Sequence, residues 1–309
     1  MRARIRDFVR TNDDWIFAVA DYVHPDGLRC LLRYVPDPGG EREMEGQRFR
    51  KVDFEEAFTL LRKEKPSYVK DLHIVPAEDV KRIYRPHEEL SRTAATDSRL
   101  AKIVGILEEG GIPREQMGIT GSMLLGLHGH SSDIDFVVYG EHWWQARDII
   151  SQAKMRGEIQ ELDRDMWLRI YNKRKPEISF QEFVAHEQRK GNRGMLGDTY
   201  FDLLFTRDWE QISPRTPGQS IGRKKMVAQV TEAALSFDAP AIFKLDGEIG
   251  ELLCFSHTYA GQALPGETIE ASGVLEETAD GLRLVVGTTR EARGEWIRSL
   301  TLLREQGLI

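Results

Sequence analysis

Residues 117–140, MGITGSMLLGLHGHSSDIDFVVYG, constrain the fold of this 309-residue chain more than any other stretch. A short apolar strand turns at Gly121-Ser122 into a short helix, and a second apolar strand, DIDFVVY, follows. Residues two apart in a strand share a face, so Asp133 and Asp135 point the same way. Two carboxylates this close repel each other and need a cation or a shared proton.

A divalent cation, Mg²⁺ or Mn²⁺, would relieve this repulsion, and Mg²⁺ commonly binds one or two protein carboxylates together with substrate phosphate oxygens. Asp202 is a third acid, in the otherwise apolar strand TYFDLLF. Because burying a bare carboxylate is costly, we expect Asp202 to face a cleft or a metal. If its strand lies beside that of Asp133 and Asp135, the three acids suit a two-metal site. The alternative is structural: Asp133 caps a loop, Asp135 is merely exposed, and Asp202 pairs with an arginine.

Gly121 and Ser122 are suited to hold a phosphate. Glycine at a strand end permits close approach of the backbone, and amides at the start of a helix can donate to an anion. The serine hydroxyl is a further donor. An ordinary tight turn is the alternative for this pair taken alone.

Gly121-Ser122, ten residues, and then Asp133-Ile134-Asp135 resemble the signature of the DNA polymerase β-like nucleotidyltransferase superfamily. That superfamily includes CCA-adding enzymes, poly(A) polymerases and antibiotic nucleotidyltransferases. The core resemblance covers roughly residues 95–210. The stretches KRKPEISFQEF, GNRGM and HTYAGQ make the whole chain similar to archaeal predicted nucleotidyltransferases of undetermined substrate.

The resemblance implies a role for each position of the motif. Gly121 and Ser122 would contact the triphosphate of an incoming nucleotide such as ATP, and Asp133 and Asp135 would bind two Mg²⁺ ions. Asp202 would bind the catalytic metal and help to deprotonate an acceptor hydroxyl. In-line attack on the α-phosphate would then release pyrophosphate.

A basic insertion separates the metal-binding strand from the strand of Asp202. We predict that Lys190 and Arg193, in the glycine-containing stretch RKGNRGM, lie at the rim of the active site and hold phosphates. A solvated charged surface is the alternative. His128 and His130 lie in the loop before Asp133. We expect both side chains to face solvent, and contact with a ligand is the alternative.

The order of predicted elements indicates an α+β fold with three domains. Residues 1–88 form an N-terminal α+β domain, and residues 89–212 form the nucleotidyltransferase core, a mixed sheet flanked by helices. Residues 213–309 form a β-rich domain, a small barrel or sandwich of short strands, with a terminal helix over residues 294–307.

Composition narrows the class of protein. A net charge of −7 gives no global attraction to nucleic acid, so any such binding is local. Two distant cysteines, Cys30 and Cys254, suit core packing in a reducing cytoplasm. No apolar run approaches the roughly 20 residues of a membrane-spanning helix, and the N-terminus lacks a signal-like apolar segment.

The leading function is metal-dependent transfer of a nucleoside monophosphate from an NTP to a hydroxyl of RNA, protein or a small molecule. A non-catalytic nucleotide- or RNA-binding protein that retains the fold is the alternative, and a metal-dependent phosphodiesterase is a third. The C-terminal domain could bind nucleic acid, although its many acids argue against this, or it could support a homo-oligomer or bind another protein.

Overall fold

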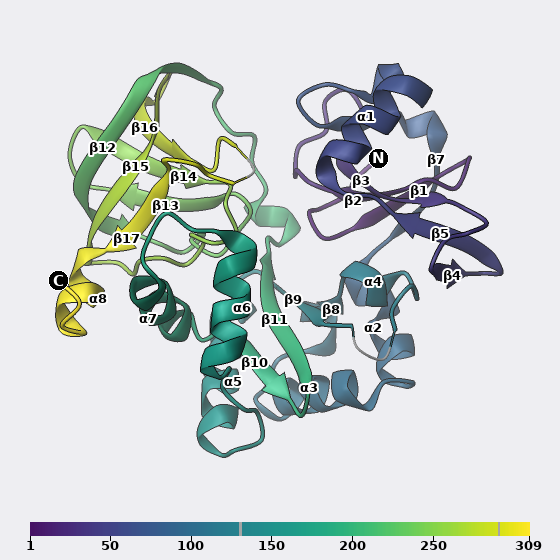
Figure 1. Cartoon of the computed structure of the whole chain (residues 1–309), viewed down its shortest axis with the longest axis horizontal. Coiled ribbons are helices and arrows are strands. Elements are labelled where there is room, and N and C mark those ends of the chain that lie inside the picture. The colour runs from purple at the N-terminus through teal and green to yellow at the C-terminus, as the bar shows by residue number, and fades with distance from the viewer. Residues whose placement is uncertain (130–131, 290) are drawn as a thin grey trace. The chain divides into compact units, whose positions relative to one another are not determined.

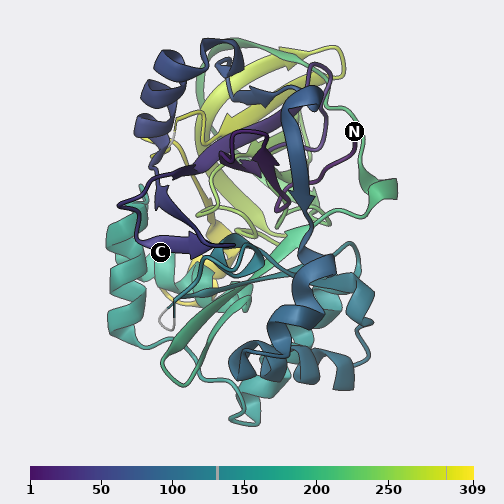
Figure 2. The same ribbon diagram turned by 90° about the vertical axis from the view of Figure 1, so that its right-hand side faces the viewer.

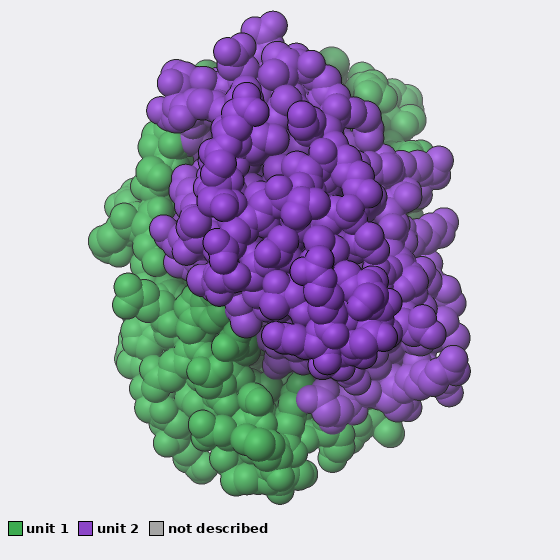
Figure 3. Space-filling view, turned by 90° about the vertical axis from the view of Figure 1, so that its left-hand side faces the viewer, with its two compact units in different colours: residues 1–160, 194–214 green, residues 161–193, 215–309 purple. Residues whose placement is uncertain are grey.

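The computed structural model describes residues 1–129, 132–289 and 291–309. By contacts, the chain forms two compact units, coloured separately in Figure 3. The first unit contains residues 1–160 and 194–214, and the second contains residues 161–193 and 215–309. Within the described ranges, no helix is both long enough and apolar enough to cross a lipid bilayer.

The first unit begins with a seven-stranded sheet in the order β4-β5-β3-β2-β1-β7, with β6 also paired to β3. The strands are β1 (Phe8–Thr11), β2 (Ile16–Val19), β3 (Leu28–Pro36), β4 (Arg42–Met44), β5 (Gln47–Lys51), β6 (His73–Val75) and β7 (Val80–Tyr84). Helix α1 (Phe54–Glu64) covers one face of this sheet (Figures 1 and 2). Asp53 caps α1 by accepting a hydrogen bond from the Glu56 amide, as its sequence indicates.

A four-stranded sheet forms the second part of this unit, in the order β10-β11-β9-β8. Its strands are β8 (Met117–Ile119), β9 (Ile134–Tyr139), β10 (Arg193–Leu196) and β11 (Thr199–Thr206). The helices of this part are α2 (Pro86–Ala94), α3 (Ser98–Glu109), α4 (Gly121–Leu124) and α5 (His142–Met155). Trp143 on α5 is fully buried with its ring edge-on to Phe205 of β11, which fits a packing role.

The N-terminal sheet shares a hydrophobic core with α4 and the loop after it. Phe8, Ile16, Tyr34 and other residues of the N-terminal sheet pack against Leu124, Leu125 and Leu127 of α4 and the loop after it. Hydrogen bonds reinforce this contact: the Thr120 hydroxyl donates to the Arg6 carbonyl at 2.6 Å, and Arg42 donates to the Leu127 carbonyl at 2.9 Å. The N-terminal sheet is therefore packed directly onto the segment that carries Gly121-Ser122.

The second unit contains a six-stranded sheet in the order β12-β13-β14-β16-β15-β17, and β12 also pairs with β15. Its strands are β12 (Gly218–Glu232), β13 (Ala241–Leu245), β14 (Ile249–Cys254), β15 (Thr268–Thr278), β16 (Gly281–Val286) and β17 (Trp296–Ser299). Helices α6 (Arg164–Arg174), α7 (Phe180–Lys190) and α8 (Leu300–Glu305) complete it. The predicted terminal helix starts too early, because residues 296–299 pair with β15 as a strand.

The mixed α+β architecture is confirmed. Along the chain, one additional sheet precedes the nucleotidyltransferase core and another follows it. Three domains were expected, and that division stays a prediction. By contact, residues 1–88 and most of the expected core fall within one unit, while α6 and α7 of the insertion belong with the C-terminal strands. Cys30 and Cys254 are both buried and free.

Candidate active site

Two carboxylates meet at the centre of the four-stranded sheet. Strands β9 and β11 run parallel, and Asp202 lies directly opposite Asp135 in their register. Directly paired residues on neighbouring strands point to the same face, so these two side chains project together. Asp133 immediately precedes β9 and is exposed, whereas Asp202 is only 5% exposed. Tyr200, two residues before Asp202, donates its hydroxyl to the Asp202 carboxylate at 3.4 Å.

Asp135 and Asp202 share a face because the residues next to each of them point to the opposite, apolar face. Ile134 and Phe136 on β9 and Phe201 and Leu203 on β11 are almost completely buried. Alternation along each strand then sends Asp135 and Asp202 to the opposite face. On the face of the acids, Leu204 packs with Val137 and Tyr139, so Asp202 stands at the edge of a small apolar cluster.

Gly121 brings the Gly-Ser turn against Asp135. Its backbone is left-handed, with φ of +69°, a conformation that glycine adopts readily. A Cβ at this position would lie 2.6 Å from an Asp135 carboxylate oxygen. The Thr120 amide also donates to the Asp135 carbonyl at 3.0 Å. The phosphate-binding candidate is therefore in direct contact with Asp135.

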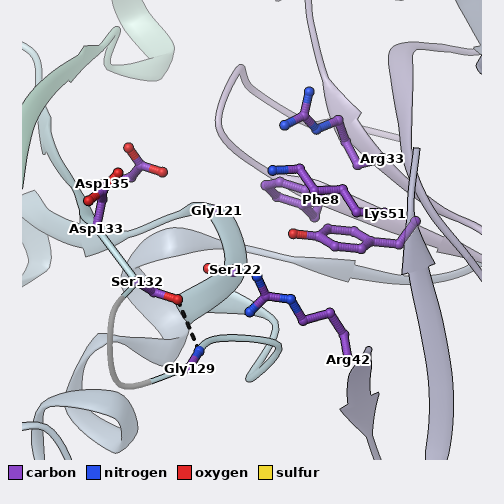
Figure 4. A pocket seen from close by; sticks show the side chains of 11 residues that line it. Phe8, Arg33, Arg42, Lys51, Gly121, Ser122, Gly129, Ser132, Asp133 and Asp135 are labelled. Atoms are coloured by element: carbon purple, nitrogen blue, oxygen red, sulfur yellow. Dashed lines mark hydrogen bonds between the residues drawn. The ribbon is translucent and has the colours of Figure 1, made fainter. Parts of the chain in front are cut away.

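A pocket of about 280 Å³ opens beside these residues. Figure 4 shows the two aspartates on one side, the Gly-Ser turn between, and three basic side chains on the other. The lining residues are Phe8, Arg33, Tyr34, Arg42, Lys51, Gly121, Ser122, Gly129, Ser132, Asp133 and Asp135. Small-molecule pockets span roughly 300–1,000 Å³, so this cavity is of a size to take part of a nucleotide.

The basic wall of the pocket comes from the N-terminal sheet, and sequence reasoning missed it. Arg33 lies on β3, Arg42 on β4 and Lys51 on β5, more than 80 residues before Asp133 along the chain. These residues stand in ordinary strand sequence without a motif. No local sequence signal marks them, because they reach the site only through the packing of one sheet on another.

The proximity of the acids shows in the pKa of Asp135. Burial, followed by the charges of Asp202 and Asp133, raises the pKa of Asp135 to about 6, while Arg6 and Arg33 oppose the shift. Oxygen ligands with excess negative charge are what a divalent cation prefers, so the donor set fits Mg²⁺ or Mn²⁺. Among the described residues, no three His, Cys, Asp or Glu side chains are grouped closely enough to hold a metal by themselves.

Lys190 and Arg193, which we predicted at the rim of the site, have other contacts. Both are nearly fully buried in the second unit. The Lys190 ammonium lies 2.6 Å from a carboxylate oxygen of Glu187 and donates to the Thr258 carbonyl, and Arg193 also pairs with Glu187. Neither lines the pocket described above. His130, one of the two histidines expected in the loop before Asp133, lies outside the described residues.

Comparison with known proteins agrees with the motif. A family model for the nucleotidyltransferase domain matches residues 100–188. The uncharacterized protein MJ1086 of Methanocaldococcus jannaschii is 37% identical over 337 aligned positions, which cover 96% of this chain and 99% of that protein. The chain belongs to the polymerase β-like nucleotidyltransferase superfamily. No solved structure matches it.

The family match and the structure supply different parts of the site. The nucleotidyltransferase match includes Gly121, Ser122, Asp133 and Asp135 but ends before Asp202. The place of Asp202 therefore rests on the β9–β11 register of this chain.

Proposed function

We propose that the protein transfers a nucleoside monophosphate from an NTP to a hydroxyl acceptor and releases pyrophosphate. The proposal rests on the pairing of Asp202 with Asp135 across β9 and β11. That pairing adds another acid beside Asp135, which already lies against the glycine-serine turn. Gly121, Ser122, Asp133 and Asp135 line the pocket, and Asp202 lies next to Asp135 on the neighbouring strand, which supports adjacent sites for phosphate, metal and proton.

Each residue has a distinct part in this scheme. Asp133 and Asp135 would hold Mg²⁺ or Mn²⁺ together with phosphate oxygens of the substrate, and Asp202 would be a further ligand. Bound metal supplies charge stabilisation at the α-phosphate and activates the acceptor oxygen. Gly121 and Ser122 hold the triphosphate through backbone amides and the serine hydroxyl. Helix α4 has only four residues, so these individual donors, rather than a helix dipole, provide the contact.

The reaction is a single in-line displacement. The acceptor hydroxyl oxygen forms a bond to the α-phosphorus, while the bond from that phosphorus to the bridging oxygen breaks. Asp202 accepts the hydroxyl proton, and pyrophosphate leaves with the bond electrons. The cationic side of the pocket stabilises the charge that builds on the phosphate oxygens.

Isosteric variants test this scheme. The purified protein is incubated with each α-labelled NTP, Mg²⁺ or Mn²⁺ and a cell extract, and labelled products are separated. We expect wild-type protein to label an acceptor and Asp135→Asn and Asp202→Asn each to reduce labelling at least 100-fold, the scale of losing a general base or a charge-stabilising group. Asp148→Asn, on an exposed part of α5, is the matched control and keeps full activity.

Other outcomes identify the competing functions. Tight NTP binding without product from any nucleotide would indicate a non-catalytic binder. Release of free nucleoside monophosphate, without pyrophosphate and without a labelled acceptor, would indicate hydrolysis by a phosphodiesterase. Full activity in both Asp135→Asn and Asp202→Asn would refute the proposed site.

For the second unit we propose a small β-barrel that recruits the acceptor or a second copy of the chain. Pairing of β12 with both β13 and β15 supports a closed arrangement of β12, β13, β14, β16 and β15. The first half of β12 is exposed and carries Arg223, Lys224 and Lys225. Arg223 and Lys225 are paired with Glu295 and Glu270, so this strand is not a purely basic surface.

A further inference from the structure

An irregularity in strand β3 places Arg33 in the pocket. Ile16 of β2 pairs with Tyr34, but the next residue, Phe17, pairs with Leu32, so Arg33 has no partner on β2. Such a β-bulge inserts one extra residue and re-aims the side chains around it, and bulges are frequent beside active sites. Regular alternation would send Arg33 and Tyr34 to opposite faces, yet both line the same pocket.

The core residues show the change of face directly. Leu28, Cys30 and Leu32 pack in the core beneath α1. Tyr34, which would continue that series in a regular strand, instead packs in the opposite core with Leu124 of α4. The bulge therefore turns the end of β3 toward the nucleotidyltransferase core.

Two further cations share this face of the sheet. Lys51 of β5 lies directly opposite Tyr34, and Arg42 of β4 lies opposite Phe49, which belongs to the same core as Tyr34. Arg42 is fixed by its hydrogen bond to the Leu127 carbonyl, close to the end of α4. Three strands thus each contribute one cation to the wall that faces Gly121-Ser122 (Figure 4).

The Arg33 guanidinium is half-buried, and it makes no hydrogen bond or ion pair within the described parts of the chain. Its charge lowers the pKa of Asp135 without forming a salt bridge to it. A guanidinium held in a pocket without a protein partner has all its donors available for a ligand, and its planar fork matches phosphate oxygens.

We infer that Arg33, placed by the β3 bulge and assisted by Lys51 and Arg42, binds the β- and γ-phosphates of the incoming NTP. The inference rests on the proposed function, since it extends the nucleotide site from the Gly-Ser turn to the N-terminal sheet. The ligand is a polyphosphate chain opposite the carboxylates, and the N-terminal sheet is an integral part of the nucleotide site.

Calorimetric titration without acceptor tests this inference. The protein is titrated in Mg²⁺ with ATP, with AMP and with inorganic tripolyphosphate, which reports the phosphate contacts whatever base the enzyme prefers. Loss of a charge-assisted hydrogen bond costs about 1.5–3 kcal/mol, so we expect Arg33→Gln to weaken ATP and tripolyphosphate binding roughly 10- to 100-fold. AMP binding should be unchanged, and Arg33→Lys should restore part of the affinity.

Arg48→Gln is the matched control, since Arg48 is an exposed arginine of β5 that does not line the pocket. It should bind all three ligands as wild type does. Unchanged ATP and tripolyphosphate binding in a folded Arg33→Gln protein would overturn the inference. So would a raised KM for the acceptor alone, which would assign Arg33 to a phosphate on the acceptor. If either result is found while the protein still labels its acceptor, only the inference about Arg33 is refuted. If the protein shows no transfer at all, the proposed function is refuted.

Discussion

At the scale of single residues, the site depends on negative charges held close together. Asp135 is the most constrained of them, because it contacts the Gly121 turn and pairs in register with Asp202. Burial, followed by the charges of Asp202 and Asp133, raises the pKa of Asp135 to about 6. The folded protein therefore holds a proton on this carboxyl more tightly than the unfolded chain does. Its ionisation lowers stability as pH rises from about 4 through 6.

Stability falls as Asp135 ionises, whereas the affinity for a metal ion should rise. A cation and a proton compete for Asp135, so we expect Mn²⁺ affinity to rise from pH 5 to pH 7 and to level off above that, as the carboxyl with a pKa of about 6 loses its proton. Calorimetric titration with Mn²⁺ across this range measures the effect. Asp135→Asn should bind Mn²⁺ weakly at every pH. A wild-type affinity independent of pH between 5 and 8 would contradict this account of Asp135.

The sequence predicted some of the site residues but not how they are brought together. The spacing of Asp133 and Asp135 indicated a shared direction, and the apolar surroundings of Asp202 indicated a special role. That Asp202 lies opposite Asp135, however, is a fact of strand pairing that no spacing could supply. Lys190 and Arg193 were predicted from their charge and nearby glycines, but sequence could not show that Glu187, three residues before Lys190, already pairs with both.

At the scale of elements, the turn between β8 and α4 sets the distance between the phosphate site and the carboxylates. Gly121→Ala would introduce a Cβ 2.6 Å from the Asp135 carboxylate and would also strain a backbone of φ +69°. The left-handed conformation alone costs about 1–2 kcal/mol. We expect lower thermal stability together with at least a tenfold loss of Mn²⁺ affinity and of nucleotide transfer.

Gly126→Ala separates these two effects. Gly126 ends the same short segment with φ of +70°, but nothing lies within 4 Å of the position of its Cβ. This variant should lose a similar amount of stability and keep its Mn²⁺ affinity. Equal losses of metal affinity in both variants would mean that the contact of Gly121 with Asp135 is unimportant.

The elements themselves follow from recognisable patterns, but their irregularities do not. Helix α1 begins directly after its capping residue Asp53, and the short strands flanking Gly121-Ser122 lie where alternation and turns indicate. The bulge at Arg33 has no such signal, because LRCLLRYVP reads as an ordinary strand. The sequence of β17 has apolar residues spaced for a helix, and its pairing with β15 overrides that pattern.

At the scale of the whole molecule, the N-terminal sheet is joined to the nucleotidyltransferase part by a core that it shares with α4 and the loop after it. Leu124 is fully buried in that core, between α4 and strands β1, β2, β3 and β5. Leu124→Ala should cost about 2–5 kcal/mol of unfolding free energy, as buried leucine truncations do. Because α4 packs in this core and also contacts β9, hydrogen exchange should accelerate in both β3 and β9.

Leu168→Ala makes the same truncation at a leucine of α6 that is 37% exposed, and it should change stability much less. Faster exchange in β9 alone after Leu124→Ala would show that the two sheets unfold independently. The shared core would then not be what places Arg33, Arg42 and Lys51 opposite the carboxylates.

Nucleotidyl transfer at the paired carboxylates is tested most directly by product stoichiometry. Pyrophosphate and labelled acceptor are measured in the same reaction, with an α-labelled NTP, Mg²⁺ and the acceptor fraction of a cell extract. We predict one pyrophosphate for each nucleoside monophosphate transferred, with both products lost together in Asp202→Asn. Orthophosphate in place of pyrophosphate, or undiminished production of both by Asp202→Asn, would contradict the proposal.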